Sequence, residues 1–256
     1  MIDIIARPLG MLLKFMYNLC VSIGLDFERL SAYSMAIILA TIVFKLILLP
    51  LTIKQTKSMQ GMQAIQPKMK ELQKKYKNDP QKLNEETMKL YKDNKVSPFG
   101  GCLPLLVQFP ILIGYFRVMQ DPVKYVFESQ AAFDAMGKGF LWIIDIAQKP
   151  TAIINGMPND FQIAGVTIPI IAIISAITTY FYSKYSMQMQ PTTDGASDQA
   201  QSTQKIMLYI TPAMFLYFGY SYPVGFTIYW TVSNIFQIVQ QLILNKTFKK
   251  VKGESN

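Results

Sequence analysis

Residues 32–53 read AYSMAIILATIVFKLILLPLTI, an apolar run close to the ~20 residues that a helix needs to cross a bilayer. One charge, Lys45, lies inside this run. A lysine near the middle of a bilayer costs about 2.5–3.5 kcal/mol, so its presence needs a reason. Snorkelling of the long side chain to the nearer interface is one explanation. However, Ser34, Thr41 and Thr52 fall within roughly 40° of Lys45 around a helix, and snorkelling does not require such a polar stripe.

The composition of the whole chain is that of an integral membrane protein. Its 256 residues are 51% hydrophobic, with a mean hydropathy of +0.22. The net charge of +9 is concentrated in residues 54–97 and 246–252, as expected for cytoplasmic segments of a membrane protein. The chain has no histidine, the commonest metal ligand and general base. We therefore expect no metal, no cofactor and no enzymatic activity.

The apolar runs predict an all-α protein with five transmembrane helices, its N-terminus outside and its C-terminus in the cytoplasm. The expected spans are residues 31–53, 98–119, 162–184, 206–222 and 224–245. Residues 1–30 are interrupted by charges and Pro8, and their helical apolar spacing favours an interfacial helix outside the membrane. The remaining segments are a cytoplasmic helical hairpin (54–97), an extracytoplasmic loop (120–161), a cytoplasmic loop (185–205) and a basic cytoplasmic tail (246–256). Within the loop 120–161, Trp142 is a candidate interfacial anchor.

The hairpin prediction depends on a seam of apolar residues that repeat every three or four positions between residues 59 and 76. The sequence Asn78-Asp79-Pro80 then indicates a turn, and Pro67 should interrupt the first arm. The methionines of this segment have two interpretations. They form either the core of the hairpin or a soft, adaptable surface for a client protein. The candidate client contacts are Met59, Met62, Met69 and Met88.

The expected spans contain no Asp or Glu, so Lys45 has no internal partner of opposite charge. Polar side chains on the other spans could surround it with water, although small polar residues also serve helix packing. Amides are harder to explain by packing alone because they are costly in lipid. We therefore predict a hydrated cationic groove that attracts an ion, an anionic metabolite or an acidic polypeptide. The candidate groove residues are Lys45, Ser34, Thr41, Thr52, Gln108, Trp230, Thr231, Asn234 and Gln237.

Four stretches of the chain resemble the YidC/Oxa family of membrane protein insertases. They are KLILLPLTIKQTKSM (45–59), QPKMKELQKKY (66–76), GGCLPLLVQFPILIGYF (100–116) and YPVGFTIYWTVSNIFQIVQQ (222–241). The resemblance implies five transmembrane helices around a hydrophilic groove that is open to the cytoplasm and to lipid, and a cytoplasmic hairpin that receives clients. The family's functional basic residue falls on Lys45, where many members carry arginine, which grips carboxylates with a bidentate fork that lysine lacks.

The leading hypothesis is thus an insertase and chaperone in the bacterial cell membrane. Its expected partners are nascent membrane proteins, membrane lipids, the Sec translocon and, through the basic tail, the ribosome. No G-x-x-x-x-G-K-[ST] loop is present, so we expect no nucleotide. A small-anion transporter is the second hypothesis, although no internal repeat supports it. An intramembrane enzyme fits least well, since the spans carry no acidic residue or histidine.

Overall fold

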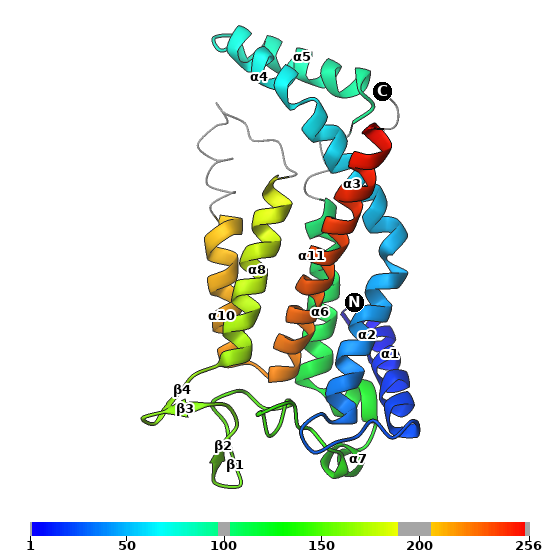
Figure 1. Cartoon of the computed structure of the whole chain (residues 1–256), viewed down its shortest axis with the longest axis vertical. Helices are drawn as coiled ribbons and strands as arrows, with labels where there is room; N and C mark the ends of the chain where they lie inside the picture. The colour runs from blue at the N-terminus through cyan, green and yellow to red at the C-terminus, as the bar shows by residue number, and fades with distance from the viewer. Residues whose placement is uncertain (1, 97–102, 189–205, 254–256) are drawn as a thin grey trace.

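A computed structural model describes residues 2–96, 103–188 and 206–253 of the chain, and these residues are mostly helical. Helices lie side by side along the long axis, with a helical hairpin across one end and short β-hairpins at the other (Figure 1). The C-terminus is at the same end as the helical hairpin (Figure 1). The upright helices are α1 (Ile2–Ser22), α2 (Ala32–Ile47), α6 (Leu103–Gln120), α8 (Ile170–Gln188), α10 (Thr211–Ser221) and α11 (Val224–Gly253).

The first expected span, residues 31–53, is not one straight helix. Helix α2 ends at Ile47, and α3 (Leu49–Ala64) continues after a bend of 59°. Pro50 lies in the first turn of α3 and has no backbone N–H to donate, which explains the break at this point. The second half of α3 extends beyond the expected span towards the hairpin, so the hairpin arms themselves are shorter than residues 54–97.

The helical hairpin consists of α4 (Gln66–Lys75) and α5 (Pro80–Asp93), which contact one another. Helix α3 ends at Ala64, and Pro67 lies in the first turn of α4, so the first arm is interrupted where the sequence predicts it. The turn between the arms closes with Asp79, whose side chain accepts a hydrogen bond from the Lys82 N–H and caps α5. The antiparallel hairpin predicted from the sequence is therefore present.

The opposite end of the molecule has more structure than the expected loop. It contains η2 (Val123–Phe127), α7 (Gln130–Ala135) and two antiparallel pairs: β1 (Ile153–Ile154) with β2 (Met157–Pro158), and β3 (Gln162–Ile163) with β4 (Val166–Thr167). The Trp142 side chain is 39% exposed and its indole N–H donates to Asp160 Oδ1 at 2.7 Å. Its role as an interfacial anchor stays a prediction.

Two of the later predicted boundaries differ from the structure, while the fourth span begins at residue 206 as predicted. The third span was expected at residues 162–184, but α8 begins only at Ile170, because Ala164 and Gly165 have positive φ angles and turn the chain into β3–β4. The fourth expected span, residues 206–222, starts as a π-helix, η3 (Ile206–Ile210), before α10. Helix α11 continues past residue 245 to Gly253, so the first part of the basic tail is helical.

Helix α1 is continuous across the charges and the proline that interrupt the apolar residues of this segment. Pro8 does not break it, and the helix packs against α2 and α6 through a buried face that includes Leu9 and Leu13. Among the described helices, α1 is the one that is long and apolar enough to span a membrane by itself, and α2 with α3 qualifies as a bent pair. The five spans, their orientation and the interfacial position of α1 thus stay predictions.

Candidate functional site

Lys45 lies in the last turn of α2 and is only 5% exposed. Its ammonium Nζ donates a hydrogen bond to Gln108 Oε1 on α6 at 3.0 Å. The same amide donates through Nε2 to the Tyr229 hydroxyl on α11 at 3.1 Å. Side chains from three helices thus form one continuous hydrogen-bonded chain. The sequence prediction that Lys45 and Gln108 face the same interior is consistent with this contact.

Aromatic rings hold this hydrogen-bonded chain in place. The rings of Tyr229 and Tyr115 are stacked with centroids 3.9 Å apart, and both side chains are almost fully buried. Stacked aromatic pairs of this kind stabilise a structure by about 0.5–1.5 kcal/mol beyond the area that they bury. The Tyr229 hydroxyl is therefore a fixed acceptor, and it orients the Gln108 oxygen towards Lys45.

A second polar group lies between α8 and α11 and is organised by Thr179. The Thr179 hydroxyl accepts from the Trp230 indole N–H at 3.0 Å and from Asn234 Nδ2 at 2.8 Å, while it donates to the Ser175 carbonyl at 2.7 Å. The Trp230 ring also stacks on Phe215 of α10, with centroids 3.8 Å apart. Trp230 and Asn234, both predicted as groove residues, are thereby fixed against α8.

The other predicted groove residues hydrogen-bond mainly within their own helices. Thr41 and Thr231 are buried and donate to backbone carbonyls four residues earlier. Ser34 lies in the first turn of α2 and exchanges hydrogen bonds with Ser31, which places it at a helix cap rather than beside Lys45. Thr52, on α3, accepts a hydrogen bond from Gln240 of α11. Gln237 donates to Ser233, also on α11.

Acidic side chains do not balance the charge of Lys45 in the described part of the chain. No ion pair to Lys45 is found among those residues, and its hydrogen-bond acceptor is the neutral amide of Gln108. Within the same residues, no group of three or more Asp, Glu, Cys or His side chains could hold a metal ion. The arrangement is therefore a buried cation with a neutral partner, suited to an electrostatic contact with an anionic group.

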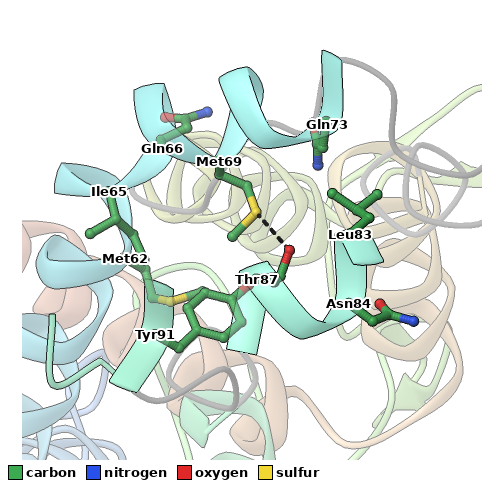
Figure 2. A pocket seen from close by; sticks show the side chains of 9 residues that line it. All are labelled: Met62, Ile65, Gln66, Met69, Gln73, Leu83, Asn84, Thr87 and Tyr91. Carbon is green, nitrogen blue, oxygen red and sulfur yellow. Dashed lines mark hydrogen bonds between the residues drawn. The ribbon is translucent and has the colours of Figure 1, made fainter. Parts of the chain in front are cut away.

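A cavity lies in the hairpin, between α4 and α5 and the end of α3. It has a volume of about 280 Å³. Figure 2 shows the side chains that line it, among them Met62 of α3, Met69 of α4, and Leu83, Thr87 and Tyr91 of α5. The Thr87 hydroxyl donates to the Met69 sulfur at 3.6 Å.

Of the four predicted methionine contacts, three are buried and one is exposed. Met59, Met62 and Met69 are 4%, 6% and 7% exposed, whereas Met88 is 50% exposed. Burial of the first three favours the interpretation that they form the core of the hairpin and its junction with the bundle. Met88 alone offers an open surface in the described hairpin.

Two central residues were not selected from the sequence. At about 100° per residue, the predicted polar face of the fifth span extends from Gln237 through Trp230 to Thr231, and Tyr229 falls outside it on the side opposite Thr231. Thr179 belongs to a group of small polar residues on the third expected span, which packing explains equally well. Only the spatial meeting of α8 with α11 shows that Thr179 accepts two side-chain hydrogen bonds.

The structure thus defines a mostly helical protein with buried polar side chains between its helices. Residues 26–252 match the family model described as 60Kd inner membrane protein. The chain therefore belongs to this family, the YidC/Oxa family, as its sequence motifs predict. It is consequently a bacterial cell-membrane protein.

Curated relatives support the same assignment. The "Membrane protein insertase YidC 1" of Listeria monocytogenes serotype 4b is 36% identical over 227 residues, which cover 87% of this chain and 67% of the relative. The "Membrane protein insertase YidC" of Geobacter sp. strain M21 is 35% identical over 243 residues, 95% of this chain but 37% of the relative. The "Membrane protein insertase YidC" of Leptospira interrogans serovar Lai is 33% identical over 226 residues, 87% of this chain and 33% of the relative.

Proposed function

We propose that this chain inserts nascent membrane proteins into the bilayer and assists their folding. An acidic or polar N-terminal segment of the client enters the polar interior of the bundle, where the charge of Lys45 attracts it. The client's apolar helix meanwhile moves along the outside of the bundle into lipid. The relatives named membrane protein insertases support the assignment of this activity.

The single observation that carries the proposal is the neutral partner of Lys45. The amide of Gln108 satisfies one ammonium N–H without cancelling the positive charge. Two opposite unit charges 4 Å apart attract by about 1 kcal/mol in water and about 4 kcal/mol at an effective dielectric constant near 20. A client carboxylate that reaches Lys45 would gain an energy in this range, enough to favour its entry several-fold or more.

Apolar side chains are exposed on the two helices that contribute Lys45 and Tyr229. Leu46 and Ile47 directly follow Lys45 and are 50% and 62% exposed, and Ile235 and Val239 of α11 are 47% and 48% exposed. Exposed side chains of this kind suit contact with acyl chains or with an apolar client helix. In our proposal, the client helix moves along α2 and α11, and partitioning into lipid and the membrane potential provide the driving force.

The remaining contacts follow from the same proposal. The hairpin receives the client first, with Met88 as its open methionine and with the cavity bordered by Met62 and Met69 as a second apolar surface. The basic tail, residues 246–256, contacts the ribosome, and lysines near the bilayer surface add about 1 kcal/mol each towards anionic lipids. The chain acts alone or beside the Sec translocon.

Insertion into proteoliposomes, followed by protease protection, tests the electrostatic role. One client carries an N-terminal segment with aspartates, and its matched control carries serines at the same positions. Lys45→Arg keeps the charge and should support insertion of both clients. Lys45→Gln keeps a hydrogen-bond donor but not the charge, and should slow the acidic client about 10-fold or more while sparing the serine control.

Lys45→Glu gives the decisive result. This variant places a negative charge in the path and should nearly abolish insertion of the acidic client. Normal insertion of that client by the Glu variant would refute the electrostatic role. Anion flux through vesicles that contain no client would instead favour the transporter hypothesis.

A further inference from the structure

A small polar pocket lies between Lys45 and the hairpin end of the bundle. Its volume is about 40 Å³, and α3, α8 and α11 each contribute side chains to its wall. The described residues that border it carry no charge, and amides and hydroxyls dominate among them. The residues that line it are Thr52, Gln55, Thr56, Met59, Tyr182, Ser186, Gln237, Gln240 and Gln241.

Two amides of this pocket carry buried atoms without a hydrogen-bond partner among the described residues. Gln55 is 4% exposed, and its donor Nε2 has no acceptor. Across the pocket on α11, the acceptor Gln241 Oε1 is buried and has no donor. A buried polar atom that makes no hydrogen bond costs about 1–3 kcal/mol. One donor and one acceptor on residues that line the pocket are thus available to a guest with the complementary pair.

Three other polar side chains of the pocket donate hydrogen bonds within the protein. Gln240 donates to the Thr52 hydroxyl, and Thr56 donates to the Thr52 carbonyl at 2.9 Å. Gln237 donates to the Ser233 carbonyl at 3.2 Å. The Gln240 bond links α11 to α3, whereas the Thr56 and Gln237 bonds each lie within one helix. Gln55 and Gln241 are thus the pocket residues with a buried atom that lacks a partner among the described residues.

We propose that this pocket binds the polypeptide backbone of a client's polar segment on its way to Lys45. A peptide unit has one N–H and one C=O, which match the free acceptor of Gln241 and the free donor of Gln55. Binding through the backbone does not depend on the client's side chains, as a protein with many clients requires. The small volume and uncharged wall fit one peptide unit and exclude a large or charged side chain.

This inference rests on the proposed insertase function, and the position of the pocket along the chain supports that link. Gln55 follows Lys45 by ten residues, beyond the bend between α2 and α3, on the side of the hairpin. A segment that enters from the hairpin end therefore meets the neutral amides before it meets the charge. The two sites act in sequence, the first on the backbone and the second on acidic side chains.

The test uses the full-length chain in proteoliposomes and two clients that differ only in their N-terminal segments. One segment contains Gly, Ser and Asp, and the other contains Gly and Ser alone, so neither has a side-chain amide that could imitate the backbone. Gln55→Leu removes the free donor, and Gln241→Leu independently removes the free acceptor. Gln60→Leu is the matched control, because Gln60 is on the same helix but bonds Asn245 and does not border the pocket.

We expect Gln55→Leu and Gln241→Leu each to slow both clients about 2- to 12-fold, the loss of one net hydrogen bond of about 0.5–1.5 kcal/mol. Gln60→Leu should insert both clients like the wild type. In detergent, Gln55→Leu should melt at or above the wild-type temperature, since it replaces an unpaired buried amide by an apolar group. A loss of insertion without a loss of stability distinguishes binding from a structural role.

Three results would overturn the inference. Equal insertion by Gln55→Leu, Gln241→Leu and Gln60→Leu would do so while leaving the insertase function intact. Slower insertion of only the Asp-containing client would also overturn it, because the pocket would then respond to charge and not to the backbone. If the wild type inserts neither client, the proposed function fails, and the inference fails with it.

Discussion

Replacing Thr179 by valine should loosen the contact between α8 and α11. Valine keeps the shape of threonine but removes the hydroxyl that accepts from Trp230 and Asn234. The two N–H donors would then remain buried without a partner. Asn234 is fully buried, and its Oδ1 already has no partner among the described residues, so it cannot easily reorganise.

The size of the effect follows from the number of lost bonds. In water-soluble proteins an unsatisfied buried group costs about 1–3 kcal/mol, which would give about 2–6 kcal/mol for two donors. Side-chain hydrogen bonds inside membrane bundles are weaker, about 0.6 kcal/mol on average and at most about 1.7 kcal/mol. We use the membrane values because α8 and α11 are expected spans, and predict that Thr179→Val destabilises the fold by about 1–3 kcal/mol.

The adjacent Thr178 provides a matched control. Its hydroxyl donates only to the Ser175 carbonyl of its own helix, at 2.9 Å. Thr178→Val should therefore change the free energy of unfolding by no more than about 0.5 kcal/mol. Unfolding in mixed micelles, followed by tryptophan fluorescence, measures both variants, and Thr179→Ser should restore most of the loss. If Thr179→Val and Thr178→Val unfold alike, the reasoning about a shared acceptor is wrong.

Three further predictions test other parts of the fold. Met69→Ala should destabilise the hairpin by about 2–5 kcal/mol, while Met88→Ala should stay within about 0.5 kcal/mol, as limited proteolysis of the hairpin can show. Gly219→Ala places a Cβ 2.5 Å from the Ala172 Cβ of α8. Thermal unfolding should therefore show a loss of about 1–3 kcal/mol, and a gain, as helix propensity alone predicts, would contradict this close approach. Burial is the main cause that raises the pKa of Asp160 above its ordinary 3.8, so the folded state binds this proton more tightly than the unfolded state. Stability should rise as the pH falls through the raised pKa towards 3.8, and Asp160→Asn should remove that part of the melting profile.

The sequence predicted those features that depend on local chemistry. Pro67 marks the interruption of the hairpin arm, and Asp79 with Pro80 marks its turn, because proline and helix-capping residues act on their own neighbours. The nearness of Lys45 and Gln108 was predicted from polar faces alone. Amides and charges are costly in lipid, so both are expected inside the bundle and not on its lipid-facing surface.

Features that depend on tertiary context were missed. Residues 162–167 are uncharged and include the β-branched Ile163 and Val166, so hydropathy cannot separate a strand pair from the start of a helix. The turn at Gly165 reverses the chain, so residues 162–167 form a pair of strands and not the first turns of a helix. Pro50 was treated as part of a continuous span, since proline within a membrane helix is often accommodated, yet here it coincides with a bend of 59°.

Under the proposed insertase function, the neutral partner of Lys45 would allow one site to accept a client and release it. A hydrogen bond to a charged donor contributes about 1.5–3 kcal/mol, and a carboxylate acceptor makes a stronger bond than a neutral amide does. A client carboxylate can therefore replace Gln108 at the ammonium. Gln108 keeps its own bond to Tyr229, whose ring is fixed against Tyr115, so its oxygen remains in place when the client occupies Lys45. When the client helix moves into lipid, Lys45 can return to a partner that has not moved, whereas an acidic residue at position 108 would hold the lysine permanently.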